Sequence, residues 1–211
     1  MNLSEIVTAA RQRLEDETQP YLFSTSRLEY WANEANIEAC RRSRYLVDNT
    51  QSVSLVTGVS DYDNPDNIIF IKRGKLSTED LPLFICSYKD MDEIPGWETH
   101  TGTPTHLILD MSFDKFKVYP TPDSSYTLNL ITINEPELLT NDINVPARFG
   151  YSYVDWICFR AYQTKDVETF DKALSLECLA HFENEFGTRS SAKDEIYNFR
   201  NRPLNGFDGD F

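Results

Sequence analysis

Residues 101–133 read TGTPTHLILDMSFDKFKVYPTPDSSYTLNLITI, and this stretch decides the fold. Pro120 and Pro122 lack N–H donors and fix φ, so we expect a strand that stops at Tyr119. Asp123 can bond local backbone groups and turn the chain into the next strand. The link MSFD is short enough for a hairpin before that point. Three runs alternate apolar and polar residues as half-buried strands do: 105–110, 115–120 and 126–133.

Further strands are predicted upstream of this stretch. QSVSLV (51–56) and NIIFIKR (67–73) have strand character, and LPLFI (81–85) suits an edge strand because Pro82 cannot donate to a ladder. SYKDMDEIPGW (87–97) looks like a short helical turn. Because no crossover helices separate the strands, we expect an antiparallel sandwich or small barrel rather than a parallel sheet.

The strand candidates in the quoted stretch alternate in a compatible way. Phe116 and Val118 in one run match Leu128 and Leu130 in the next. Such alternation suits a half-buried antiparallel sheet.

Helical periodicity dominates both ends of the chain. Residues 3–16 carry an i, i+3, i+4, i+7 apolar stripe, and Ser26 with Glu29 forms a capping box for a second helix. Arginines at 41, 42 and 44 suit the negative end of that helix dipole. Helices are expected again after Pro146, from about 170 to Gly187, and from 191 to 199. The residues expected to pack in the core or between subunits are Leu14, Leu28, Trp31, Tyr153, Phe170 and Phe182.

The element order predicts an α+β fold. Each terminal helix pair has one apolar face, so the first pair is expected to pack on the last as a helical bundle. We predict a bundle domain from 1–48 and 146–202, an inserted β domain over 49–145, and a flexible tail over 203–211.

Composition limits the possible classes. The chain has 211 residues and a net charge of −14, which disfavours conventional binding to nucleic acid. Its charged start does not resemble a secretory signal and no apolar run is long enough to span a membrane, so we expect a soluble protein made in a cytoplasm. Four single cysteines are expected to be buried thiols in the core.

No catalytic signature is present in the sequence. The metalloprotease, hydrolase, Walker and dinucleotide motifs are missing, so we predict no enzyme, no cofactor and no catalytic or metal residues. His181 is expected to be a hydrogen-bonded boundary residue. The loop DYDNPDN (61–67) holds three aspartates that could bind calcium, but it lacks the EF-hand glycine and glutamate, and a turn is favoured.

Several segments together resemble the head-to-tail adaptor, or connector, proteins of tailed bacteriophages. The similarity covers roughly residues 3–185 in order. It rests on Arg11, Leu14 and Asp16 at a helix end, on NEA at 33–35, on GTP at 102–104 before a strand, and on the YPTPD turn at 119–123. DYDNPDN departs from the plainer turn that such proteins often have.

The resemblance implies a structural ring, usually of twelve copies, between the portal of the capsid and the next tail or nozzle protein. It implies assembly in the host cytoplasm, a place in the neck of the virion, contact with the portal through the helical part and C-terminal segment, and passage of genomic double-stranded DNA without specific binding. No membrane is implied. The candidate portal-docking residues in the tail are Arg200, Arg202, Leu204, Phe207 and Phe211.

A second interpretation is a ligand-binding module of a virion protein. In it, the β region would recognise a glycan or peptide by stacking on Trp97, Tyr119 and Tyr126. A hydrolase is a third possibility, which the missing motifs disfavour.

Overall fold

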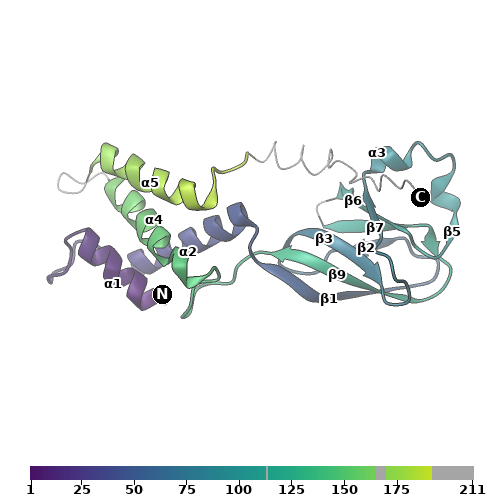
Figure 1. Cartoon of the computed structure of the whole chain (residues 1–211), viewed down its shortest axis with the longest axis horizontal. Coiled ribbons are helices and arrows are strands. Elements are labelled where there is room, and N and C mark those ends of the chain that lie inside the picture. Colours follow the sequence, from purple (N-terminus) through teal and green to yellow (C-terminus); the bar gives the residue numbers. More distant parts are fainter. Residues whose placement is uncertain (113, 165–169, 192–211) are drawn as a thin grey trace. The chain divides into compact units, whose positions relative to one another are not determined.

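A computed structural model of the chain describes residues 1–112, 114–164 and 170–191 (Figure 1). The described chain divides into two compact units. A helical unit contains Met1–Leu46 and Glu135–Arg189, and a β unit is built on Val47–Asn134. The predicted α+β class is therefore confirmed.

The helical unit is assembled from two helices at each end of the chain. They are α1 (Leu3–Arg13), α2 (Thr25–Ser43), α4 (Gly150–Tyr162) and α5 (Lys172–Phe186), with the 3-10 turn η2 (Ala147–Phe149) directly before α4. Figure 1 shows α4 between α5 and the α1–α2 pair, and α4 packs against all three. Among the described residues, no helix is long and apolar enough to cross a membrane.

Side chains fix where the helices begin. Asn2 and Glu5 form a capping box at the start of α1. At α2 the predicted cap is wrong: Ser24, not Ser26, has the extended backbone of an N-cap, and its Oγ accepts from the N–H of Arg27 at 3.3 Å. The capping rule fits both serines, and the extended backbone at Ser24 starts the helix two residues earlier.

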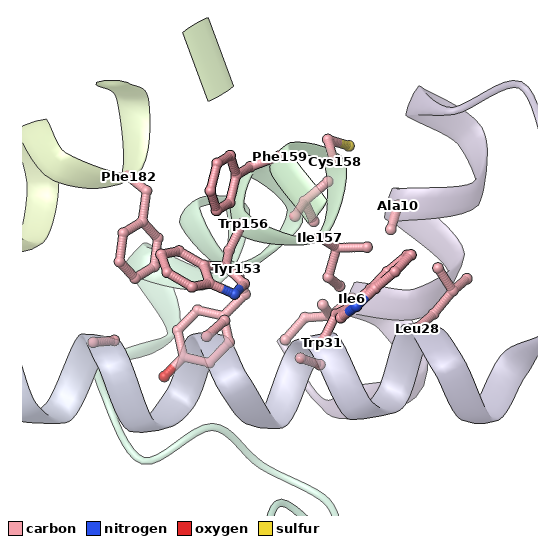
Figure 2. Packing of buried hydrophobic residues seen from close by; sticks show 14 of the residues in the cluster. Ile6, Ala10, Leu28, Trp31, Tyr153, Trp156, Ile157, Cys158, Phe159 and Phe182 are labelled. Carbon is pink, nitrogen blue, oxygen red and sulfur yellow. The ribbon is translucent and has the colours of Figure 1, made fainter. Parts of the chain in front are cut away.

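Aromatic residues of α4 fill the centre of the helical unit. Figure 2 shows the rings of Trp156 and Phe182 side by side and the Tyr153 ring directed toward α2. The centroids of Trp156 and Phe182 lie 4.7 Å apart. Ile6 and Trp31 complete this core from α1 and α2.

The β unit contains two main sheets. One has the order β1 (Val47–Leu55), β9 (Tyr126–Asn134), β3 (Ile68–Leu76) and is antiparallel. The other has the order β2 (Asp61–Asp63), β7 (Lys115–Tyr119), β6 (His106–Ser112), β4 (Phe84–Cys86). A third pair joins β5 (Thr101–Gly102) to β8 (Thr121–Pro122). In the described residues these sheets stay open and form no closed barrel, and the sandwich stays a prediction.

Two strand pairs are parallel, which the sequence interpretation did not expect. β4 runs parallel to β6, and β5 runs parallel to β8. Between β4 and β6 lie the short helix α3 (Tyr88–Met91) and the 3-10 turn η1 (Trp97–Thr99). This segment carries the chain back to the start of the sheet, as a parallel pair requires.

One hydrophobic core serves both main sheets. Leu76 and Leu128 from the first sheet pack with Leu107 and Phe116 from the second. Gly74 marks the closest approach, because a Cβ there would lie 3.1 Å from Leu107 Cδ2 and 3.3 Å from Leu128 Cδ1. Glycine at this position therefore lets the side chains of the two sheets meet.

The proline turn ends a strand as predicted. β7 stops at Tyr119, the Tyr119–Pro120 peptide is cis, and Asp123 Oδ1 accepts from the Tyr126 hydroxyl at 2.6 Å. The hairpin between β6 and β7 is also confirmed. The expected sheet partnership of β7 with β9 is wrong, because the turn sends the chain into the other sheet.

Candidate interaction surfaces

Most of the predicted packing residues lie in the helical core. Leu28, Trp31, Tyr153 and Phe182 are buried, and Leu14 is half-buried against them. Phe170 is different. It precedes α5 and is 57% exposed, so its predicted place in the core is wrong and only its packing against another subunit stays a prediction.

The buried face of α5 is narrower than its apolar residues suggest. Its buried face consists of Ser175, Cys178, Phe182 and Phe186, whereas Leu174 is exposed. The apolar positions of α5 fit more than one stripe, and packing on α4 selects a narrow one.

The candidate portal-docking residues lie outside the described residues. They are Arg200, Arg202, Leu204, Phe207 and Phe211, and the helix expected at 191–199 lies almost wholly there as well.

Arg11 and Asp16, two residues of the adaptor resemblance, form a buried ion pair. Arg11 Nη1 lies 2.8 Å from Asp16 Oδ2, and Arg11 Nη2 donates to the carbonyl of Phe23 at 3.1 Å. The Asp16 carboxylate also accepts from the backbone N–H groups of Leu22 and Phe23. Tyr21 covers the guanidinium, whose carbon lies 3.8 Å from the ring centroid. The pair therefore holds the loop between α1 and α2 in one shape.

Asn36 forms a second buried polar centre, which sequence reasoning missed. Its Oδ1 accepts from the Tyr153 hydroxyl at 2.8 Å, and its Nδ2 donates to Asn144 Oδ1 at 2.6 Å and to the carbonyl of Glu137 at 3.3 Å. Burial raises the pKa of Tyr153 well above its ordinary value, so the hydroxyl stays a donor. The only signal in the sequence is an asparagine on the apolar face of α2.

Arg42 joins α2 to α5. Its guanidinium lies 2.9 Å from Glu38 Oε2 and 3.5 Å from Glu183 Oε1, and its side chain is 5% exposed. The same group lies over the rings of Trp156 and Phe182, at 5.5 and 5.3 Å from their centroids. The expectation that Arg42 only complements a helix dipole therefore misses its main role, a contact with another helix.

The aromatic cluster around Tyr119 is a packed corner of the β unit. The Tyr119 hydroxyl bonds His100 Nδ1 at 2.8 Å, and its ring packs edge-on against Trp97. Trp97 is only 6% exposed, Tyr88 packs edge-on against it, and Lys117 lies over its ring. With Trp97 covered in this way, the cluster gives little support to a stacking platform for a glycan.

The residues that carry the adaptor resemblance thus build structure. Arg11 and Asp16 shape a loop, Asn33 Oδ1 accepts from the backbone of Leu139 at 2.7 Å, and the turn after Tyr119 redirects a strand. A family model described as SU10 adaptor protein matches residues 1–205. The chain belongs to the SU10 adaptor protein family. The resemblance is confirmed, since this is a family of phage head-to-tail adaptors. No curated protein matches the chain.

The name of the SU10 adaptor family indicates that its members are structural proteins of the virion neck rather than enzymes. The three described histidines contact neighbours: His100 bonds Tyr119, His106 bonds Thr105, and His181 lies 3.6 Å from Asp155.

The aspartates of DYDNPDN do not form the predicted turn throughout. Asp61 and Asp63 lie in strand β2, where each faces a lysine of β7. Asp61 Oδ1 lies 3.6 Å from Lys117 and Asp63 Oδ1 lies 3.5 Å from Lys115. In the ranges that the structure describes, no group of three or more potential ligand side chains could hold a metal ion.

A groove of about 550 Å³ opens between α1 and the start of α2 in this adaptor. Its walls include Ser4, Thr8, Thr25 and Glu29, and the described residues that line it contain no histidine or cysteine. The groove therefore offers hydroxyl, amide and carboxylate groups for hydrogen bonding.

Exposed apolar side chains occur on two outer faces of the helical unit. Tyr30 (66% exposed) and Ile37 (47%) lie two turns apart on α2. Leu174 and Leu176 are exposed on α5, and Phe170 directly precedes that helix. Tyr30 and Ile37 share one face of α2, whereas Leu174 and Leu176, two positions apart, lie on opposite flanks of the buried face of α5. The α2 face and the Leu176 flank of α5 are the candidate contact surfaces of the adaptor.

Proposed function

We propose that the chain is a head-to-tail adaptor that assembles as a ring, of twelve copies, beneath the portal of a tailed phage. The ring gives a channel for the genome and a platform for the next tail or nozzle protein. The single observation that carries this proposal is the family match over residues 1–205. The geometry of the helical unit supplies a physical reason for a ring.

A closed ring needs two different surfaces on each copy, because a head-to-tail contact repeats around an axis. The helical unit offers two such surfaces, one on α2 around Tyr30 and Ile37 and one on the flank of α5 that carries Leu176. Burying exposed leucines and aromatic rings against a neighbouring copy gives roughly 25 cal/mol per Å² of apolar area. We therefore place the contact between copies on these two faces.

Charge supports the role of a passage for DNA. Twelve copies at −14 each would carry 12 × −14 = −168 formal charges. Such a field repels the phosphate backbone and disfavours sticking contacts between the ring and the genome.

Docking to the portal is assigned to the C-terminal tail and the helical domain. The tail combines the cations Arg200 and Arg202 with the apolar anchors Leu204, Phe207 and Phe211. Buried apolar anchors supply most of the binding energy in protein interfaces, and arginine is enriched among such residues.

Negative-stain electron microscopy of the full chain, alone and mixed with purified portal particles, tests the proposal. We expect a monomer or weak oligomer alone and a closed ring on the portal. A chain that ignores portal particles under conditions where they are intact would overturn it.

Two variants separate ring formation from docking. Leu176→Glu places a charge on this flank of α5 and should prevent rings, whereas Leu174→Glu, the same change on the opposite flank of the helix, is the control. Removal of residues 203–211 should weaken docking while leaving the fold intact. Tailed, DNA-filled particles formed normally with this truncation would contradict the anchor role of the tail.

A further inference from the structure

Two of the four cysteines meet in the helical unit, although they are 20 positions apart in the sequence (178 − 158). Cys158 lies on α4 and Cys178 on α5, and the contacts on either side place them at the same level of the helix pair. Ser175 Oγ donates to the carbonyl of Phe159 at 3.2 Å, and the ring centroids of Trp156 and Phe182 lie 4.7 Å apart. Cys158 is fully buried and Cys178 is 3% exposed. All four cysteines are free and buried, as expected, and the packing of α5 on α4 brings together two groups that react with each other.

Charged side chains surround this thiol pair. Arg13 Nη2 donates to Cys178 Sγ at 3.8 Å, and the Arg13 guanidinium is paired with Asp155. His181 lies one turn beyond Cys178 on α5, with Nδ1 3.6 Å from Asp155. Arg13 is 40% exposed, so the charged edge of the cluster borders solvent.

The cluster stabilises the Cys178 thiolate. Hydrogen bonding with Cys158 lowers the pKa of Cys178, and the guanidinium charge of Arg13 acts in the same direction. A lowered pKa increases the fraction of thiolate, which is the reactive form of the group. As the donor of this bond, Cys158 has its pKa raised.

The other two cysteines provide an internal contrast. Burial raises the pKa of Cys40 and of Cys86 to about 12. Cys40 donates to Asn36 Oδ1 at 3.8 Å, and Cys86 donates to the carbonyl of Leu107 at 3.9 Å. Neither contacts a second thiol, so each is suited to remain reduced.

Because both thiols are buried, an oxidant reaches the pair only when α5 opens locally. Of the helix residues, only Ser175, Cys178, Phe182 and Phe186 are buried, so α5 is an edge helix with a narrow packed face. Elements with few buried contacts open at lower free energy than the whole fold.

We propose that Cys158 and Cys178 form an intramolecular disulfide that fastens α5 to α4. The oxidant is a low-molecular-weight disulfide such as oxidised glutathione. The Cys178 thiolate attacks one glutathione sulfur, the S–S bond breaks, and one glutathione leaves as thiolate. The sulfur of Cys158 then attacks Cys178 Sγ and releases the second glutathione. The two protons of the protein thiols end on the two glutathione molecules. The protein dithiol is thereby oxidised to a disulfide, and one glutathione disulfide is reduced to two thiols.

In a protein of the virion neck, this oxidation follows release of particles from the reducing host cytoplasm. That timing rests on the proposed function, whereas the bond itself does not. If rings fail to form, the disulfide proposal is not affected. If the disulfide fails to form, the proposed ring is not affected.

The test exposes the full reduced chain to oxidised glutathione, then unfolds it in iodoacetamide and maps the peptides by mass spectrometry. We expect two alkylated thiols in place of four, a linked peptide pair containing Cys158 and Cys178, and a mass lower by two hydrogens. The midpoint of thermal unfolding should rise by several degrees and fall back after reduction with dithiothreitol.

Variants of the full chain identify the partners. Cys178→Ala and Cys158→Ala should each abolish the linked peptide, while the double variant Cys40→Ala/Cys86→Ala should keep it. Circular dichroism shows which variants fold. If a variant does not fold, the peptide mapping of the chain without substitutions still tests whether Cys158 and Cys178 are linked. Four alkylated thiols after exposure, stable glutathione adducts, or links that involve Cys40 or Cys86 would overturn the proposal.

Discussion

The helical unit and the β unit use buried polar groups very differently. Among the described residues, the buried polar side chains of the helical unit are Arg11, Asp16, Asn36, Glu38, Ser152, Asp155 and Ser175, whereas Thr132 alone represents the β unit. The core shared by the two main sheets consists of apolar side chains.

The difference follows from where helices and strands find partners for their backbone hydrogen bonds. A helix closes its hydrogen bonds internally, so only side chains can fix how one helix meets another. Strands share hydrogen bonds with their neighbours, and the ladders themselves set the register. The helical unit therefore carries pairs of polar side chains that hold its segments together, such as Arg11–Asp16 and Arg42–Glu183, which we call polar joints. In the β unit, close packing of apolar side chains is sufficient in the interior.

Removing one partner of a polar joint is expected to have the largest effect. Asp16→Ala leaves the Arg11 guanidinium buried without its carboxylate and takes an acceptor from the N–H groups of Leu22 and Phe23. We expect a loss of about 3–5 kcal/mol in the free energy of unfolding of the helical unit. Urea denaturation followed by circular dichroism measures it, and exposed Glu17→Ala is the control. A loss below 1 kcal/mol would mean that the joint does not organise the loop.

The matching change in the β unit acts through packing. Gly74→Ala brings a methyl group against Leu107, Leu128 and Leu130, at 3.1 to 3.4 Å from their methyl carbons. Overpacking of this kind costs about 1–3 kcal/mol. Hydrogen exchange should show faster opening of β3 and β9 with the helical unit unchanged, and exposed Lys72→Ala should show neither effect. Unchanged exchange in β3 and β9 would contradict close packing between the sheets.

Loss of a single hydrogen bond should cost less. Tyr153→Phe removes the hydroxyl that donates to Asn36 Oδ1, but that oxygen still accepts from the backbone of Asn144 at 3.4 Å. We expect about 1 kcal/mol of destabilisation by urea denaturation. Tyr151→Phe on the same helix, where the side chain is 72% exposed, serves as the control. Equal stability of the two variants would remove Asn36 from the set of polar joints.

An exposed ion pair of the β unit gives the smallest effect. Asp63 and Lys115 face each other across β2 and β7 at 3.5 Å, but their side chains are 84% and 57% exposed. Asp63→Ala should change stability by less than about 1 kcal/mol, with Asp66→Ala for comparison. A thermal melt detects any larger loss, which would place a polar joint in the β unit and weaken the contrast between the units.

Local features of the fold could be predicted from the sequence. The apolar stripe through Ile6 and Ala10 indicated α1, and the prolines after Tyr119 indicated the end of β7. Both depend on residues a few positions apart, because steric limits and helical periodicity act within one element.

Contacts between distant segments could not be predicted in the same way. β7 lies between β2 and β6, but its sequence would fit equally well beside β9. Residues within one strand do not indicate which strand will be its neighbour. The meeting of Cys158 with Cys178 and the link from Arg42 to Glu183 depend on how α5 packs on α4. Phe170 was expected to pack because it is apolar and stands where the helix was predicted to begin. The helix begins at Lys172 instead, and Phe170 is exposed.

The first and last long strands of the β unit have one more consequence. β1 and β9 pair antiparallel with Val47 opposite Ile133, so the chain enters and leaves the β unit at neighbouring positions. An insertion with adjacent ends can be exchanged as a module, since a replacement needs only two ends at a similar spacing. The junctions at 46–47 and 134–135 are therefore the positions at which another β domain can be grafted. Adaptors of different phages can in this way combine one helical unit with different β units.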